Sequence, residues 1–136
     1  MTRERIFLDT WFILALLNVR DADHAEAKRL LPRIRSAATL VTTDAILLEA
    51  CNGLAKYNRT GAAQFARTCY TDAQFNVIPV DRGLIQSALR QYEGVSDKAW
   101  GLTDCLSFVV MREHEIQLVA TRDHHFHQAG FITLVA

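Results

Sequence analysis

Short apolar runs alternate with longer helix-patterned segments along this chain, and that alternation restricts the fold more than any other feature. The runs that we expect to form strands cover residues 6–8, 39–42, 75–80, 117–120 and 131–135. Apolar periodicity predicts helices over residues 10–19, 22–35, 43–57, 62–72, 81–92, 103–114 and 124–129. Strands that alternate with helices form right-handed crossovers and parallel sheets. The sequence therefore predicts an α/β fold, a three-layer α/β/α sandwich around a mostly parallel central sheet of four to five strands.

Size and composition narrow the class of protein further. The chain has 136 residues, half of them hydrophobic, without internal repeats or linkers, so we expect one domain over residues 1–136. Its three cysteines are far apart and form no Cys-x-x-Cys pair, which disfavours a disulfide framework and a thiolate zinc site. We find no signal peptide or membrane span and expect a cytoplasmic protein without membrane contact. The net charge of zero argues against non-specific nucleic-acid coating.

Four carboxylates occur where the strands of the predicted sheet end. Asp9 closes the first strand, and Asp123 follows the fourth strand almost at once. Glu49 lies in the first half of the helix after the second strand, and Asp104 opens the helix that follows the long loop. Because ligands of parallel α/β sheets bind beyond the carboxyl ends of the strands, we expect these four side chains to share one site.

A shared site of this kind needs a cation. Taken singly, Asp9, Asp104 and Asp123 can be explained as helix N-caps or dipole partners, whereas the Cβ of Glu49 directs its carboxylate back toward the strand ends. Two like charges at about 4 Å repel by about 4 kcal/mol at a surface-like dielectric, and a helix N-terminus offsets only about 0.3–1 kcal/mol. An all-carboxylate ligand set favours Mg²⁺ or Mn²⁺ over zinc.

Four motifs in this order resemble those of the PIN-domain ribonucleases, and most closely those of the VapC-type toxins of bacterial toxin–antitoxin pairs. They are FLDT around Asp9, VTTDAILLEACN around Glu49, WGLTDCLSF around Asp104 and VATRDHHF around Asp123. The resemblance spans almost the whole chain. It implies a small α/β/α sandwich that carries an acidic pocket at the strand ends.

The resemblance also implies an activity. Asp9, Glu49, Asp104 and Asp123 match the acidic quartet of the family, which binds one or two Mg²⁺ or Mn²⁺ ions and carries the catalysis. A bound metal lowers the pKa of its water and neutralises charge on the scissile phosphate. The implied protein is a metal-dependent endoribonuclease that hydrolyses RNA phosphodiester bonds, as the toxin of a toxin–antitoxin pair. The implied partners are the RNA substrate, a cognate antitoxin and a second copy of the chain in a homodimer.

One position departs from the family pattern and keeps an alternative open. Many relatives carry Ser or Asn two places after the first aspartate, where this chain has Trp11, although Thr10 can replace the missing polar group. The alternative is a catalytically weak or inactive PIN-fold module that binds RNA or a partner. A receiver-like phospho-acceptor domain is disfavoured, because Asp9 has no adjacent acid and no lysine follows Lys98.

Three histidines beside Asp123 suggest a zinc site at first sight. They are His124, His125 and His127. We expect consecutive histidines on a short helix to point in different directions, and no further soft ligand is evident. A zinc site is therefore disfavoured, and the imidazoles are expected at the surface or facing RNA.

Other polar and aromatic side chains near the motifs are candidates for substrate contact. The arginines that could contact phosphate are Arg59, Arg82, Arg112 and Arg122, of which Arg122 is the best placed. Trp11 and Trp100 could stack on bases, although packing is the commoner role. The threonines near the strand ends, which are Thr10, Thr43, Thr103 and Thr121, are expected to act mainly as caps.

Overall fold

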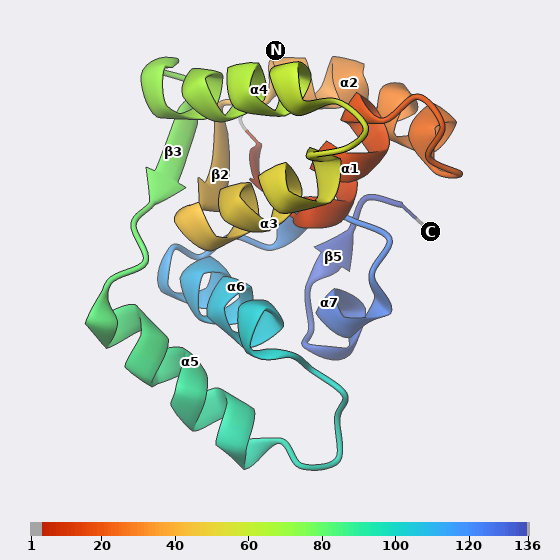
Figure 1. Cartoon of the computed structure of the whole chain (residues 1–136). Coiled ribbons are helices and arrows are strands. Elements are labelled where there is room, and N and C mark those ends of the chain that lie inside the picture. The colour runs from red at the N-terminus through yellow and green to blue at the C-terminus, as the bar shows by residue number, and fades with distance from the viewer. Residues whose placement is uncertain (1–3, 136) are drawn as a thin grey trace.

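The structure is a computed structural model that describes residues 4–135. The strands are β1 (Arg5–Leu8), β2 (Thr39–Thr43), β3 (Phe75–Ile78), β4 (Leu118–Ala120) and β5 (Ile132–Thr133). The helices are α1 (Thr10–Leu17), α2 (His24–Ser36), α3 (Asp44–Leu54), α4 (Arg59–Thr71), α5 (Arg82–Gly94), α6 (Leu102–Glu113) and α7 (His124–Gln128). Their order along the chain, shown in Figure 1, matches the predicted alternation of strands and helices.

The strands form one sheet in the order β3-β2-β1-β4-β5, and every neighbouring pair is parallel. Strand β1 is the central strand, in which Phe7 pairs with Val41 of β2 and with Val119 of β4. The predicted parallel sheet of four to five strands is confirmed, with five strands in residues 4–135.

Helices cover both faces of the sheet, as the alternation along β1 shows. Ile6 and Leu8 belong to a core cluster with α1 and α2, whereas Phe7 belongs to a second cluster with α3, α6 and α7. All three residues are fully buried. A sheet that is buried on both faces needs continuous apolar strands, which explains the short apolar runs of the sequence. The three-layer prediction is confirmed.

The ends of several elements differ from the prediction for local reasons. Helix α6 begins at Leu102, with Gly101 rather than Thr103 as its N-cap, because the carboxylate of Asp104 accepts a hydrogen bond from the Gly101 backbone N–H at 3.1 Å. Helix α4 begins at Arg59, earlier than expected, because Asn58 caps it by accepting from the Gly61 N–H at 3.0 Å.

Strand β3 lies at the edge of the sheet and ends at Ile78, directly before Pro79. This position agrees with the expectation that Pro79 marks an edge strand or its end, because proline cannot donate to a strand ladder. Helix α5 follows and packs against α6 at the lower left margin of the molecule in Figure 1. Of the helices in residues 4–135, none has the length and apolar character needed to cross a bilayer.

The carboxyl ends of the central strands face one side of the molecule. Asp9 comes directly after β1, Thr43 ends β2, and Thr121 comes directly after β4. Because the strands are parallel, these three positions lie at the same edge of the sheet. The fold therefore builds a polar edge from segments that are far apart in the sequence.

Candidate active site

A hollow of about 420 Å³ lies at this edge of the sheet. The residues that line it are Asp9, Thr10, Trp11, Leu14, Asp23, Glu49, Asp104, Arg122 and Asp123. The structure thus brings all four acids predicted from the sequence to one place, from four different elements or loops. It also adds a fifth carboxylate, Asp23, which the sequence reasoning did not select.

The carboxylate of Asp9 is positioned by a threonine, although Asp9 occupies the N-cap position of α1. It precedes α1, but its side chain makes no capping hydrogen bond to that helix. Instead, the Thr121 hydroxyl donates to Asp9 Oδ2 at 2.8 Å. The same hydroxyl accepts a hydrogen bond from the backbone N–H of Asp123 at 3.1 Å. Thr121, which is fully buried, therefore ties two of the four acids together.

The other acids are also oriented by protein donors. Asp104 accepts from the Gly101 N–H at the start of α6, and Asp123 caps α7 by accepting from the His125 N–H at 3.0 Å. The Thr10 hydroxyl donates to Glu49 Oε1. Each of the four carboxylates thus has one oxygen held by a hydrogen bond, which is how proteins orient metal-binding carboxylates.

The expectation that the four threonines act mainly as caps therefore holds for only one of them. Thr43 does cap α3, since its hydroxyl accepts from the Ile46 N–H at 3.2 Å, but Thr103 lies inside α6. Thr10 and Thr121 contact acids of the hollow. The contact between Thr10 and Glu49 agrees with the expectation that Thr10 can replace the polar group that Trp11 does not provide.

The electrostatics of the hollow are unfavourable for its own acids. Asp9 is only 8% exposed, and burial raises the pKa of its carboxyl to about 7, with further contributions from the charges of Asp123 and Asp104. Burial likewise raises the pKa of Asp104, and the negative charges of Asp123 and Glu49 add to the rise. Carboxylates in this arrangement are stabilised by a cation that neutralises them together.

His125 projects its Nδ1 between two of the acids. This atom lies 3.1 Å from Asp123 Oδ1 and 3.4 Å from Asp104 Oδ2. The ring of His124 lies 4.3 Å from that of His125, and its Nδ1 is 3.9 Å from Asp123 Oδ1. The expectation that the two histidines point in different directions is wrong, because both rings turn toward the carboxylate that caps their helix.

These contacts also identify a group that combines nitrogen and oxygen donors. Ligand atoms of Asp123, His124 and His125 lie within 4.8 Å of one another. His127 does not join them and instead lines a separate hollow beside β5. The approach of His125 to the acids could have been suspected from sequence only through its place two residues after a candidate site acid.

Two other candidates from the sequence are explained by packing or solvent exposure. Trp100 is 8% exposed, packs edge-on against Phe108 with ring centroids 5.0 Å apart, and donates its indole N–H to Gln128 at 3.0 Å. Arg112 donates to the backbone carbonyl of Ala129 at 3.1 Å. Neither side chain lines the acidic hollow.

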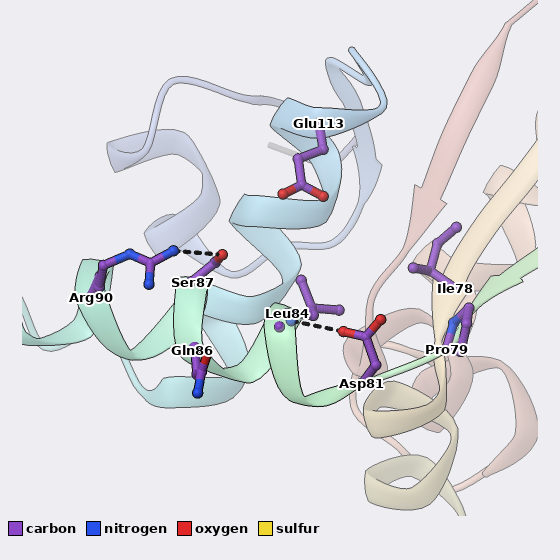
Figure 2. A pocket seen from close by; sticks show the side chains of 9 residues that line it. Ile78, Pro79, Asp81, Leu84, Gln86, Ser87, Arg90 and Glu113 are labelled. Carbon is purple, nitrogen blue, oxygen red and sulfur yellow. Dashed lines mark hydrogen bonds between the residues drawn. The ribbon is translucent and has the colours of Figure 1, made fainter.

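A second hollow, of about 550 Å³, lies along α5 and is shown in Figure 2. It contains the carboxylates of Asp81 and Glu113 and the guanidinium of Arg90. In Figure 2, Asp81 accepts a hydrogen bond from the Leu84 N–H and Arg90 donates to the Ser87 hydroxyl, so both are bound within their own helix. This hollow is larger than the acidic one, but it is lined by two carboxylates where the acidic hollow is lined by five.

Comparison with known proteins assigns the chain to a family. The PIN domain family model matches residues 6–132. The chain is 31% identical over 127 residues to the 23S rRNA-specific endonuclease VapC20 of Mycobacterium tuberculosis, which covers 93% of this chain and 95% of that protein. The chain belongs to the PIN-domain family. Within it, the chain is a VapC-type protein, as its identity to VapC20 over most of both chains shows.

Solved structures share the fold of this chain. The crystal structure of M. tuberculosis VapC20, described as a sarcin-ricin loop cleaving toxin, superposes with a TM-score of 0.83 at 30% identity over 93% of this chain and 96% of that one. FitAcB from Neisseria gonorrhoeae, with a TM-score of 0.64 at 20% identity over 94% of this chain and 95% of that one, shares the fold. So does VapBC2 from Rickettsia felis bound to a promoter DNA fragment, with a TM-score of 0.62 at 12% identity over 95% of this chain and 96% of that one.

Proposed function

We propose that this PIN-domain protein cleaves RNA with the help of a divalent metal ion held by Asp9, Glu49, Asp104 and Asp123, within one nuclease domain over residues 1–136. The observation that carries the proposal is their meeting in one hollow, where burial raises the pKa of Asp9 to about 7. Ionising a buried carboxyl beside other acids costs free energy, and a purely structural role does not explain why the fold keeps one there. Perturbed carboxyls in a hollow are typical of functional sites.

The donor atoms of the hollow fit a hard divalent cation. Its four carboxylates offer oxygen ligands, which suit Mg²⁺ or Mn²⁺. Asp9 and Asp104 would hold the ion directly, and Glu49 and Asp123 would do so directly or through water. When bound, such an ion lowers the pKa of its water and neutralises charge on a scissile phosphate.

The remaining side chains prepare the acids for this task. Thr121 holds Asp9 and the backbone of Asp123 in a fixed relation, and Thr10 holds Glu49. Because these hydrogen bonds exist before substrate arrives, the carboxylates need little rearrangement to bind an ion. The Thr10 contact favours a competent nuclease over the alternative of an inactive binding module, which rested on Trp11.

The substrate and partners follow by analogy with the relatives. The similar toxin VapC20 is named for 23S rRNA and described as cleaving the sarcin-ricin loop. We propose a structured ribosomal RNA loop as the substrate class of this chain as well. We also propose a cognate antitoxin as its protein partner, a homodimer as its assembly, and the cytoplasm as its location, where ribosomal RNA is found.

The test is cleavage of a transcript that contains the sarcin-ricin stem-loop, with Mg²⁺ or Mn²⁺ and with chelator. We expect cleavage that chelator abolishes and that Asp104→Asn reduces by about 100-fold or more, since a metal contributes several kcal/mol to the transition state. The matched control is Asp97→Asn, which removes the same charge from a carboxylate that is 76% exposed and pairs with Lys98. Cleavage that persists with chelator and in both Asp104→Asn and Asp9→Asn would refute the proposal.

A further inference from the structure

The mouth of the acidic hollow carries one positively charged side chain among the residues that line it, and that side chain is held in place. Arg122 Nη1 lies 2.5 Å from Asp23 Oδ1. The other oxygen of the same carboxylate, Oδ2, accepts a hydrogen bond from the indole N–H of Trp11 at 2.9 Å. The guanidinium carbon of Arg122 lies over the Trp11 ring, 6.0 Å from its centroid. Each of these three residues, which come from three different segments, thus contacts the other two.

The segments that carry these residues are fixed independently of the contacts between them. Trp11 lies in the first turn of α1, beside the Thr10 that holds Glu49. Arg122 stands between two residues of the acid site in the turn after β4. Asp23 ends the turn between α1 and α2, where its own N–H donates to Asp21 Oδ1 at 2.8 Å. Trp11 and Arg122 are therefore attached to the same framework as the four acids.

A role in stability alone does not explain this arrangement. The Arg122 side chain is 42% exposed and that of Asp23 is 25% exposed, and ion pairs at such positions contribute little to folding. An arginine has five N–H donors, and within residues 4–135 the structure assigns Arg122 one hydrogen bond, to Asp23. The remaining donors of a guanidinium held in this way can bind an anion in the geometry that suits phosphate.

We propose that Trp11, Asp23 and Arg122 form a phosphate clamp, in which Asp23 and Trp11 position Arg122 to bind a backbone phosphate of the RNA strand that enters the acidic hollow. The inference rests on the proposed ribonuclease function. It adds a positively charged contact for the RNA backbone at a hollow whose five carboxylates would otherwise repel a polyanion. Because Asp23 fixes the guanidinium beforehand, less side-chain entropy is lost when the strand binds. Arg122 is the binding residue, and Asp23 is a positioning residue.

The first test measures binding without cleavage. A fluorescein-labelled single-stranded RNA is titrated with Asp104→Asn protein at several salt concentrations. The titration is repeated with the double variant that carries Asp104→Asn and Arg122→Ala. We expect Arg122→Ala to weaken binding by about tenfold and to reduce the slope of log affinity against log salt by about 0.7, the value for one phosphate contact in a single strand. Arg122→Lys keeps the charge and should keep the slope while losing part of the affinity.

The matched control is Arg29→Ala, which removes an arginine from an exposed ion pair with Glu26 outside the hollow. It should leave both the affinity and the slope unchanged. An Arg122→Ala protein that binds RNA with the parental affinity and slope would overturn the clamp. So would an equal loss in Arg29→Ala, since any surface charge would then have the same effect.

The second test separates positioning from simple charge. Asp23→Asn keeps an acceptor for the Trp11 indole N–H but releases Arg122. Removing a negative charge would by itself strengthen RNA binding, whereas the clamp predicts a KM that rises about threefold to tenfold with kcat little changed. Tighter RNA binding by Asp23→Asn, with an unchanged or lower KM, would show that Asp23 has no positioning role.

Failure of the clamp and failure of the ribonuclease proposal are distinguishable. If the wild-type protein cleaves no RNA with any divalent metal, the proposed activity fails, and the clamp is then judged by the RNA-binding titrations alone. If the wild type cleaves and Arg122→Ala retains the parental KM, salt slope and affinity, the activity stands and the clamp fails.

Discussion

The two hollows of this protein both contain carboxylates and an arginine, yet they differ in how these groups are satisfied. In the hollow along α5, Asp81 caps its own helix and Arg90 bonds to Ser87, so both charges are satisfied locally and remain in contact with solvent. In the hollow at the strand ends, five carboxylates meet one arginine, and Asp9 is buried. The smaller hollow is therefore the better candidate for the active site. Its uncompensated negative charge lowers the stability of the fold, and such charge is typical of functional sites, whereas the volume of a hollow is not decisive.

The contrast predicts that neutralising an acid has different effects in the two hollows. In metal-free protein at pH 8, Asp9→Asn should raise the free energy of unfolding by up to about 4 kcal/mol, because burial raises the pKa of Asp9 from 3.8 to about 7. Asp81→Asn should change it by less than about 0.5 kcal/mol, since asparagine caps a helix as well as aspartate does. Urea unfolding in chelator measures both. A destabilised Asp9→Asn protein would contradict the interpretation.

The same raised pKa predicts a pH dependence with a definite sign. Between about pH 4 and pH 7 the folded chain keeps the Asp9 proton and the unfolded chain loses it, so the stability contributed by this group falls as pH rises. The loss is up to about 1.4 kcal/mol per pH unit within that window and levels off above it. The stability difference between Asp9→Asn and wild type should therefore grow from pH 4 to pH 7. A difference that does not change with pH would exclude burial of the Asp9 charge as its cause.

The order of elements and the meeting of the four acids were predictable because they follow from chain-level rules. Apolar runs that alternate with helical periodicity predict a parallel sheet, and residues after parallel strands gather at one edge. Asp23 was not predictable, since its approach to Arg122 depends on how the turn between α1 and α2 packs against the loop after β4. The direction of the His125 ring was missed for a related reason, because it is set by contacts with Asp104 and Asp123 across the fold.

Removing a hydrogen bond should also lower stability more in the acidic hollow than in the hollow along α5. We expect this difference to be smaller than the one produced by neutralising an acid. Thr121→Val removes the donor to Asp9 Oδ2 and leaves the Asp123 N–H without its acceptor, at a fully buried position. We expect a loss of about 1–3 kcal/mol in stability and about tenfold weaker Mn²⁺ binding, measured by urea unfolding and by calorimetry. Mn²⁺ affinity equal to that of the wild type would show that the orientation of Asp9 does not depend on Thr121.

The smallest expected effect lies in the hollow along α5, where the corresponding change is Ser87→Ala. This substitution removes the acceptor of the Arg90 hydrogen bond at an exposed site, while alanine favours the helix slightly more than serine does. The two contributions oppose each other, so the free energy of unfolding should change by less than about 0.5 kcal/mol, and RNA cleavage should equal that of the wild type. A loss of cleavage in Ser87→Ala with stability retained would mean that the hollow along α5 contacts substrate, and the contrast between the two hollows would no longer hold.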